Sequence, residues 1–336
     1  MFRFLLLLIP ALLHAAGGFQ IYAIDVEGGK STLYVSPSGQ SMLVDTGYAG
    51  YGGRDAARIL KAAQAAGILQ IDYLAISHYH KDHAGGVPQL AARIPIRNFV
   101  DHGKNFELAK DNGDVYTAYV KTRKQGNHLE VKAGDTIPLE GLRVDIVTAS
   151  GVAIQNPLPQ GGQPNPTCAK YLPIDPDRGE NSHSIGMVIQ YGSFRVVDLG
   201  DLYWNQEHDL ACPSNKIGVV DLYMTTHHGK KTSGSPQMVW ALHPRVAIMN
   251  NGPDTGGSEQ AWQTIHDSPG FLDLWQLHYA AKNDRKHNTD DRMIANTKEK
   301  DCAGDWIRVV AQSDGSFTVR NGRTGFEKSY PSEPRP

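Results

Sequence analysis

The chain has 336 residues, of which 40% are apolar and 20% charged, with 33 Lys and Arg balanced by 35 Asp and Glu. This length supplies a hydrophobic core large enough to fold without a disulfide or a metal, and the ordinary composition excludes a disordered, collagen-like or coiled-coil chain. The formal net charge of −2 excludes a uniformly basic nucleic-acid binder and leaves only a local basic groove for such a ligand.

The first residues predict an exported protein. Arg3 precedes an apolar run from Phe4 to Leu13, and small residues follow at 15–18, which is typical of a secretory signal peptide. The run is shorter than the roughly 20 residues that span a bilayer. We expect a signal peptide over 1–17 with cleavage near 15–17, no later membrane span, and a periplasmic or extracellular mature protein. An uncleaved anchor and a buried first strand are the alternatives.

The three cysteines are too few for a disulfide scaffold, and they form no CxxC metal pattern. Cys168, Cys212 and Cys302 allow one bridge in an oxidising compartment and leave one thiol over. The sequence does not specify which pair is joined.

Along the chain, strands first form a meander and then alternate with helices, twice over. The expected strands lie at 20–26, 31–35, 41–44, 71–76, two within 131–148, a hairpin over 184–199, and 219–225, 245–249, 306–311 and 316–320. The expected helices lie at 54–66, after Gly86, and at about 114–124, 235–242 and 258–267. The Pro- and Gly-rich stretch at about 151–181 predicts a long loop. This order predicts a single α/β domain over 18–330, folded as a four-layer αββα sandwich of two mixed sheets with helices outside.

The strongest chemical signal follows the buried strand at 71–76. His78, His80, Asp82 and His83 stand within six residues, and a loop can turn the first two towards one point and the last two towards another. Imidazole and carboxylate groups bind Zn²⁺, Mn²⁺ or Fe²⁺, and two such points suit metals about 3.5–4 Å apart, as in hydrolytic two-metal sites. A solvated His-rich loop is the alternative, but four potential ligands directly after a strand favour a metal site.

Three further loci also follow predicted strands. Asp45 precedes a Gly turn and is either a turn cap or a group that orients the site. Asp201 follows the hairpin, where one carboxylate suits a bridge between two metals and an ordinary turn Asp is the alternative. His227 and His228 follow the strand at 219–225, and ordinary core or surface histidines are the alternative there.

Together these residues resemble the metallo-β-lactamase fold superfamily. Its HxHxDH motif matches the cluster at 78–83, its early Asp matches Asp45, its bridging Asp matches Asp201, and its late His falls at 227–228. More narrowly, the chain is similar to the secreted hydrolase module of ComEC-type competence proteins in three segments: the acidic-Gly segment 25–29, the stretch 180–184 and the His-His-Gly-x-x-x-Ser element 227–233. The resemblance spans about residues 20–250 and implies a metal-dependent hydrolase.

The chain departs from the family pattern at two points. Where many members carry a third His for the first metal, this chain has Glu180, with His183 nearer the hairpin. We favour His183 as that ligand, with Glu180 or water as alternatives. The family's Asn-x-x-x-x-His-Pro signature is missing after residue 249. We interpret His278 and His287 as surface or pocket-rim residues rather than ligands.

On this resemblance, the expected ligands divide between two ions. His78, His80 and Asp201, with the third ligand, hold one ion, and the other is held by Asp82, His83, Asp201 and His228. His227 is left to stabilise negative charge on the substrate or transition state, and an exchange of roles between His227 and His228 stays open. Asp45 orients a ligand or the loop through hydrogen bonds, so Asp82, His227 and Asp45 are the expected catalytic residues. Lys230, Lys231 and Ser233 either contact an anionic group or belong to a solvated loop.

The expected function is hydrolysis of a phosphodiester, in nucleic acid or a small phosphate diester. Two metals lower the pKa of a bound water, so that hydroxide forms near neutral pH. Zn²⁺ is the expected metal, with Mn²⁺ or Fe²⁺ as alternatives, and no obligate protein partner is expected. The competing interpretations are a carbonyl hydrolase acting on a lactam, lactone or thioester, a secreted metal-binding interaction protein without turnover, and a di-iron protein that handles oxygen.

Overall fold

A computed structural model describes residues 18–107, 110–299 and 301–334. The signal peptide expected over 1–17 lies outside the described residues. Within them, no helix has both the length and the apolar character needed to cross a bilayer.

The first half of the chain builds most of one nine-stranded sheet, in the order β20-β19-β18-β1-β2-β3-β4-β5-β6. β1 to β3 form the expected antiparallel meander, whereas β3 to β6 run parallel. The bounds are β1 Phe19–Ala23, β2 Thr32–Val35, β3 Ser41–Val44, β4 Ile71–Ala75, β5 Ile96–Asp101, β6 Asn127–Glu130, β18 Ile307–Ala311, β19 Phe317–Asn321 and β20 Glu327–Tyr330.

The second sheet has the order β17-β16-β15-β14-β12-β11-β8-β7, with β9 paired to β8. The hairpin β11–β12 is antiparallel, and β12 to β17 run parallel. The bounds are β7 Thr136–Ile137, β8 Arg143–Ala149, β9 Val152–Ala153, β11 Gly186–Tyr191, β12 Phe194–Asp198, β14 Leu222–Met224, β15 Val246–Met249, β16 Asp273–His278 and β17 Ile294–Asn296.

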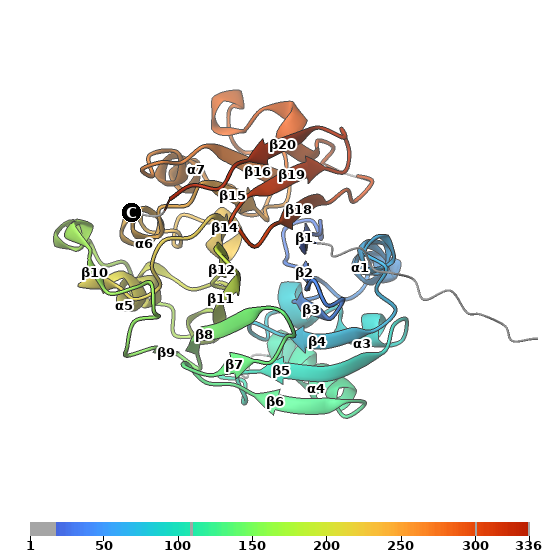
Figure 1. The fold of residues 1–336 in the computed structure, drawn as a ribbon. Helices are drawn as coiled ribbons and strands as arrows, with labels where there is room; N and C mark the ends of the chain where they lie inside the picture. Colours follow the sequence, from blue (N-terminus) through green and yellow to red (C-terminus); the bar gives the residue numbers. More distant parts are fainter. Residues whose placement is uncertain (1–17, 108–109, 300, 335–336) are drawn as a thin grey trace, which may run out of the picture.

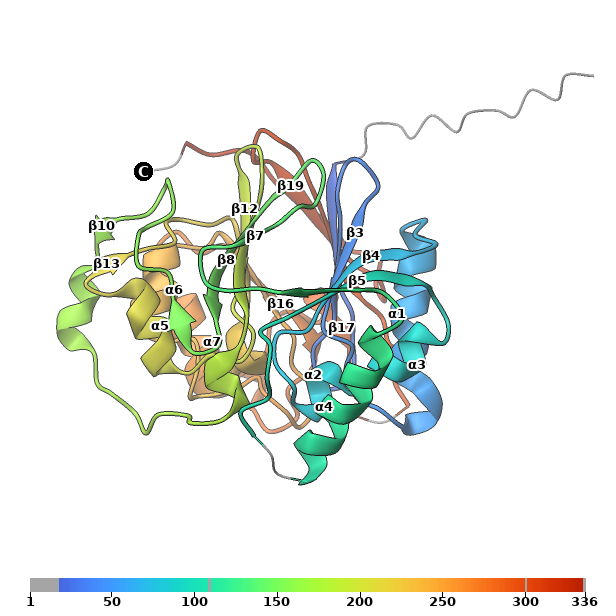
Figure 2. The same ribbon diagram turned by 90° about the horizontal axis from the view of Figure 1, so that it is seen from below.

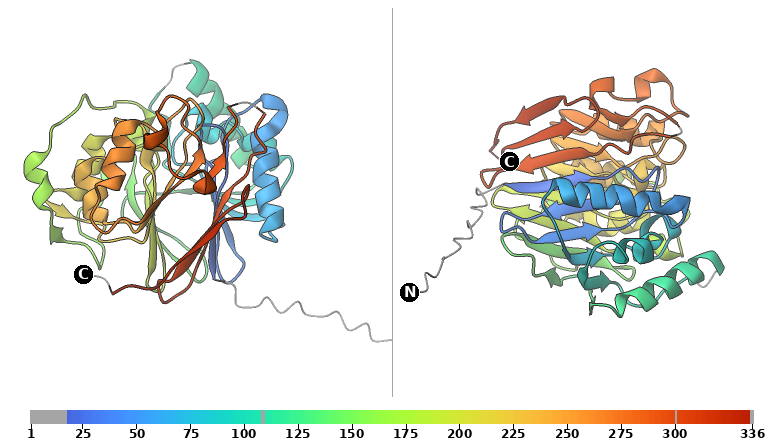
Figure 3. Two further views of the ribbon diagram at one scale, coloured as in Figure 1. Left: turned by 90° about the horizontal axis from the view of Figure 1, so that it is seen from above. Right: turned by 90° about the vertical axis from the view of Figure 1, so that its right-hand side faces the viewer.

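Helices cover the outer face of each sheet, and the two sheets face each other, which confirms the predicted four-layer sandwich (Figures 1 and 2). On the first sheet lie α1 Arg54–Ala65, α3 Val87–Ala91 and α4 Lys110–Arg123, with the short α2 Lys81–Ala84 beside them. On the second lie α5 Trp204–Ala211, α6 Pro236–Leu242 and α7 Glu259–His266. Figure 3 shows the same layers from two other sides.

Three apolar clusters hold the four layers together. The central cluster lies between the sheets and includes Ile21, Met187 and Trp275. Each outer cluster joins one sheet to its helices, as Leu74 does beneath α1 and Val197 beneath α5 to α7. Both faces of the central strands are therefore buried, which is why those strands read as continuous apolar runs in the sequence.

Several strands of the structure were not predicted from the sequence. All four residues of β6 are exposed, so no apolar alternation marks this edge strand. β16, β17 and β20 are also unexpected. The expected loop at 151–181 contains β9, the strand β10 Gln163–Pro164, which pairs with β13 Ser214–Asn215, and the 3₁₀ helix η2 Pro166–Lys170. A disulfide between Cys168 and Cys212 fastens this segment to the end of α5 and leaves Cys302 as the free thiol.

Candidate metal centre

The predicted site residues lie where four strands end. Asp45 follows β3, the segment 77–83 follows β4, Asp201 follows β12, and the 3₁₀ helix η4 Thr226–Gly229 follows β14. β3 is parallel to β4, and β12 is parallel to β14, so within each sheet the two carboxyl ends share one edge. This edge is where ligands bind in open sheets with parallel strands.

Three of these residues have backbones in the left-handed region. The φ angles of Asp45, His227 and His228 are 62°, 52° and 56°, a conformation that residues other than Gly seldom adopt. Such backbone strain persists where surrounding contacts hold it, and it gathers at functional sites. The left-handed backbone at these three positions therefore favours a functional role for their side chains, at a cost in local stability.

His78 and His80 form the first pair of imidazoles. His78 Nε2 lies 3.0 Å from His80 Nδ1, while the other nitrogen of His78 lies 3.1 Å from Ser77 Oγ and 3.4 Å from Ser184 Oγ. Burial, followed by the neighbouring His83 and His80, holds the pKa of His78 well below its usual value. His78 is therefore neutral, which is the form of imidazole that binds metals.

Asp45 orients His83. Its carboxylate accepts hydrogen bonds from the backbone N–H of Ser77 at 2.8 Å and from Ser77 Oγ at 2.7 Å. The same carboxylate lies 2.8 Å from His83 Nδ1, and both side chains are fully buried. Because Nδ1 is engaged by Asp45, the remaining nitrogen of His83, Nε2, faces the centre of the site. A buried carboxylate behind a ligand histidine is the usual arrangement around protein-bound metals.

Asp201 lies at the centre of the second group. Its Oδ2 is 3.3 Å from His83 Nε2 and 3.4 Å from His228 Nε2, and these two nitrogens are 3.3 Å apart. Asp82 Oδ2 completes the group, 3.5 Å from His228 Nε2 and 3.8 Å from His83 Nε2. Asp201 Oδ1 is buried and has no hydrogen-bond partner among the described residues. The carboxylate of Asp201 thus has one oxygen that contacts the imidazoles and one buried oxygen without a partner among the described residues.

The pKa shifts show a strongly polarised centre. Burial alone raises the pKa of Asp201, but His83, His227 and His228 outweigh it and hold that pKa well below its usual value. Burial lowers the pKa of His83, yet Asp201, Asp45 and Asp82 outweigh it and raise that pKa well above the usual value. The buried carboxylates therefore attract positive charge into the centre.

His227 lies at the side of this group. Its Nε2 is 3.4 Å from Asp201 Oδ2 and 3.0 Å from Lys230 Nζ, and its Nδ1 is 3.1 Å from Ser233 Oγ. Burial lowers the pKa of His227 to about 3, with Lys230 acting in the same direction and Asp201 opposing. His227 is thus neutral beside a lysine. His228, not His227, shares a potential metal-binding group with Asp82 and His83.

These residues fit a divalent metal centre. The donor atoms form two groups, and within each group they all lie within 4.8 Å of one another. One group comprises His78, His83 and Asp201, and the other comprises Asp82, His83 and His228. They offer only nitrogen and oxygen, which suits Zn²⁺, Mn²⁺ or Fe²⁺. Facing imidazole nitrogens and an unpartnered carboxylate oxygen are both costly when buried, and a cation would relieve both. The ligand assignments stay predictions that this geometry allows.

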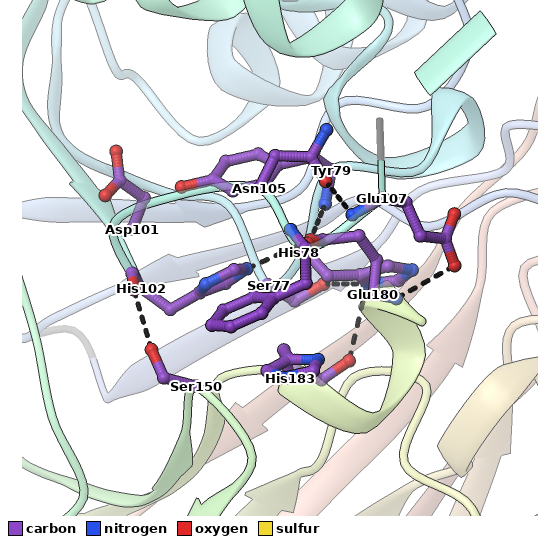
Figure 4. A network of polar contacts seen from close by, with 12 residues as sticks. Ser77, His78, Tyr79, Asp101, His102, Asn105, Glu107, Ser150, Glu180 and His183 are labelled. Carbon is purple, nitrogen blue, oxygen red and sulfur yellow. Dashed lines mark hydrogen bonds and ion pairs between the residues drawn. The ribbon is translucent and has the colours of Figure 1, made fainter. Parts of the chain in front are cut away.

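His183 and Glu180 occupy different positions from the other predicted ligands. The ring of His183 stacks on Phe106 with centroids 3.6 Å apart, and its Nδ1–H donates to Gly179 O at 2.8 Å. Among the described residues, no contact joins His183 to the His78–His80 pair, so its role as third ligand remains a prediction. The carboxylate of Glu180 is fully buried and accepts hydrogen bonds from the backbone N–H groups of Tyr79 and Phe106 (Figure 4). Glu180 therefore stabilises the backbone of the HxHxDH motif at Tyr79.

Sequence reasoning missed three groups around the centre. Glu107 Oε2 lies 3.1 Å from His80 Nε2, and Asn250 Nδ2 lies 3.4 Å from His228 Nδ1. Lys30 is 1% exposed and is ion-paired with Asp198, whose other oxygen accepts a hydrogen bond from Tyr34 OH at 3.0 Å. None of these residues belongs to a motif, and the available sequence signal was that Lys30 directly follows the acidic-Gly segment 25–29.

The interpretation of His278 as a surface or rim residue is wrong. Its ring is 1% exposed at the end of β16, and its Nε2 lies 2.9 Å from Asp25 Oδ1. The error arose because β16 was not expected, so the flanking polar residues suggested a surface stretch.

The fold and the site together define a class of protein. Residues 24–178 match the model of the metallo-beta-lactamase superfamily, so this part of the chain is similar to a superfamily whose members typically hold two metal ions.

Among the chain's relatives are two curated proteins. "Recombination protein 2" of Haemophilus influenzae is 27% identical over 70% of this chain and 24% of its own length. "ComE operon protein 3" of Bacillus subtilis is 23% identical over 74% of this chain and 30% of its own length. This chain thus spans less than a third of either relative. The solved structure of the metallo-beta-lactamase fold protein YhfI from Bacillus subtilis is also similar, with a TM-score of 0.47 and 12% identity over 77% of this chain and 96% of that one.

Proposed function

We propose that this protein is an exported hydrolase that uses two divalent metal ions, most favourably Zn²⁺, to cleave a phosphodiester. The observation that carries the proposal is the position of Asp201. Its Oδ2 lies 3.3–3.4 Å from Nε2 of His83, His227 and His228, and its Oδ1 is buried with no hydrogen-bond partner in the part of the chain that the structure describes. A carboxylate placed in this way between two sets of donors suits a bridge between two cations.

The chain's own residues would divide the work. His78, His80 and Asp201 would hold one ion, and Asp82, His83, Asp201 and His228 the other, with the bound metals lowering the pKa of a water and stabilising the leaving oxygen. Asp45 keeps Nε2 of His83 directed inwards through its contact with Nδ1. His227, anchored at Nδ1 by Ser233, would face the negative charge that develops on the substrate.

An anionic substrate is favoured by Lys230. Its ammonium lies 3.0 Å from His227 Nε2 and is partly exposed, so it puts positive charge at the border of the centre. The names of the two curated relatives refer to recombination and to a ComE operon, which favours nucleic acid over other phosphate diesters. Export is supported by the resemblance of residues 1–17 to a signal peptide and by the disulfide between Cys168 and Cys212.

The test combines metal analysis with three substrates. The purified mature protein is analysed for metal content per chain and assayed with bis(p-nitrophenyl) phosphate, single-stranded DNA and a chromogenic lactam, alongside Asp82→Asn. At least two metals per chain and diester cleavage that disappears in the variant would support the proposal.

The other outcomes separate the competing functions. Lactam cleavage without diester cleavage would move the assignment to carbonyl chemistry. Metal binding with no turnover of any of the three substrates would favour the metal-binding interaction protein. A protein that takes up no metal would overturn the proposal.

A further inference from the structure

A second cluster of metal-binding side chains lies outside the predicted centre. Asp25 follows β1 of the first sheet, His278 ends β16 of the second, and Cys302 lies in the connection from β17 to β18. Asp25 and His278 are each 1% exposed, and Cys302 is partly buried. Carboxylate, imidazole and thiol atoms of these three residues lie within 4.8 Å of one another.

The distances converge on one point. His278 Nε2 lies 2.9 Å from Asp25 Oδ1 and 3.7 Å from Cys302 Sγ. Cys302 Sγ lies 3.2 Å from Asp25 Oδ2 and 3.4 Å from Glu27 Oε1. Glu27 thus adds a second carboxylate, and the set comprises one sulfur, one nitrogen and two oxygen donors.

This geometry argues against a nucleophilic relay. In a Cys-His-Asp arrangement the histidine contacts the thiol with one ring nitrogen and the carboxylate with the other. Here the same Nε2 of His278 faces both Cys302 and Asp25, while Nδ1 is buried without a hydrogen-bond partner among the described residues. Convergence on a single ring nitrogen is instead what a shared cation requires.

The net charge of the side chains around this cluster suits a divalent cation. Arg58 contacts Asp25 Oδ2 at 2.8 Å, Glu27 Oε1 at 2.9 Å and Cys302 Sγ at 3.1 Å. Arg54 pairs with Glu27 and with Asp55. The carboxylates of Asp25, Glu27 and Asp55 and the guanidinium groups of Arg54 and Arg58 together carry one net negative charge. Ionisation of the Cys302 thiol would add a second, and one divalent cation would neutralise both. Burial and the carboxylate of Asp25 raise the pKa of Cys302 to about 12, so the thiol stays protonated unless a cation is present.

We propose that Asp25, Glu27, His278 and Cys302 form a separate, mononuclear Zn²⁺ site that joins the two sheets. Four ligands of sulfur, nitrogen and oxygen suit tetrahedral Zn²⁺. An entry path exists, because Glu27, Arg58 and Cys302 line a pocket of about 710 Å³. The site also supports the predicted centre, since the segment that begins at Asp25 ends at Lys30, whose backbone N–H donates to Asp82 O at 3.0 Å.

Cobalt titration of the full mature chain tests this proposal independently of activity. A thiolate bound to Co²⁺ gives a charge-transfer band in the near ultraviolet, whereas nitrogen and oxygen ligands do not. Cys302 is the only free thiol, because the other two cysteines form the disulfide. We expect the band to reach saturation at about one Co²⁺ per chain, to persist in His80→Ala, and to be lost in Cys302→Ser and His278→Gln.

The matched control is His287→Gln, because His287 belongs to another Glu-Asp-His group in which both carboxylates are exposed, and this variant should keep the band. Thiol labelling adds a second readout: Zn²⁺ should slow modification of Cys302 in His80→Ala, and Asp25→Asn should remove that protection. Absence of the band from the wild-type protein, or its persistence in Cys302→Ser, would overturn the proposal. Since the band does not depend on turnover, failure of this site is distinguishable from failure of the proposed hydrolase.

Discussion

His83 and His228 bring their Nε2 atoms to within 3.3 Å of each other, although 145 positions separate them in the chain. His83 belongs to α2, after a strand of the first sheet, and His228 to η4, after a strand of the second. The predicted centre is therefore assembled only when the two sheets pack face to face. Neither half of the sandwich holds the full set of donors.

Replacing a partly exposed residue of the centre should sharply reduce turnover while preserving the fold. The side chains of His80 and Asp82 are 21% and 18% exposed, so His80→Ala and Asp82→Asn should change the free energy of unfolding by no more than about 1 kcal/mol. Metal-dependent turnover should fall by about 10²–10⁴-fold, the range for one catalytic side chain. Steady-state kinetics with added metal and urea unfolding measure the two effects. Undiminished activity in both variants would refute the assigned mechanism.

Asp45→Asn should weaken metal binding without direct loss of a ligand. Asn tolerates the left-handed backbone at this position, and its carbonyl can still accept from the N–H of Ser77. Its amide cannot accept a hydrogen bond from His83 Nδ1, so the ring loses its orientation. We expect about a 10–100-fold loss of metal affinity, measured by competition with a chromogenic chelator. The control is Asp135→Asn, at an exposed turn; equal losses in both variants would show that Asp45 has no special role.

Glu180 should make stability depend on pH in the acid range. Although burial opposes it, hydrogen bonding to His102 and to the backbone holds the folded-state pKa of Glu180 below its usual 4.5. The unfolded chain therefore binds the proton first as the pH falls, so this stabilisation is present above pH 4.5 and is lost progressively below it.

Glu180→Gln tests this dependence. It should destabilise the protein by about 1–3 kcal/mol at neutral pH, and the difference from the wild type should shrink as the pH falls. Urea unfolding at several pH values measures it, with Glu140→Gln at an exposed position as control. A constant difference across the acid range would contradict the assignment.

Removing the disulfide should destabilise the protein through its unfolded state. Cys168 and Cys212 are 44 positions apart, and closing a loop of that length is worth about 4 kcal/mol in the chain-entropy model. The double variant Cys168→Ser with Cys212→Ser should lose about that much stability in urea unfolding. The wild-type protein in reductant should match it. An unchanged unfolding midpoint would mean that the bridge contributes nothing.

The sequence predicts a candidate centre because most of its residues follow the ends of strands. His78, His80, Asp82 and His83 stand together in the chain, so their juxtaposition needs only a loop after β4. Asp45 and Asp201 are recognisable because each lies within three residues of the end of a strand and close to a glycine. Glu107 has no such signal, since its contact with His80 depends on the path of the segment before α4.

The second cluster shows the limit of this reasoning. Asp25 and His278 are 253 positions apart, Asp25 just after a strand of the first sheet and His278 at the end of a strand of the second, and the sequence does not predict the second of these strands. The sequence does not specify whether Cys302 is the free thiol or a bridge partner, because cysteine pairing depends on distances that sequence spacing does not encode.

By itself, the sequence determined the layered α/β fold and the resemblance to the superfamily, and it predicted the candidate donor residues. Apolar periodicity and local motifs carry that information, because both depend on neighbours in the chain. Only the tertiary structure decided which donors meet across the two sheets, that Glu180 braces the backbone of the motif, that Cys168 pairs with Cys212, and that His278 is buried against Asp25. These relationships depend on how two sheets twist and pack, and packing is a property of the whole chain rather than of any segment.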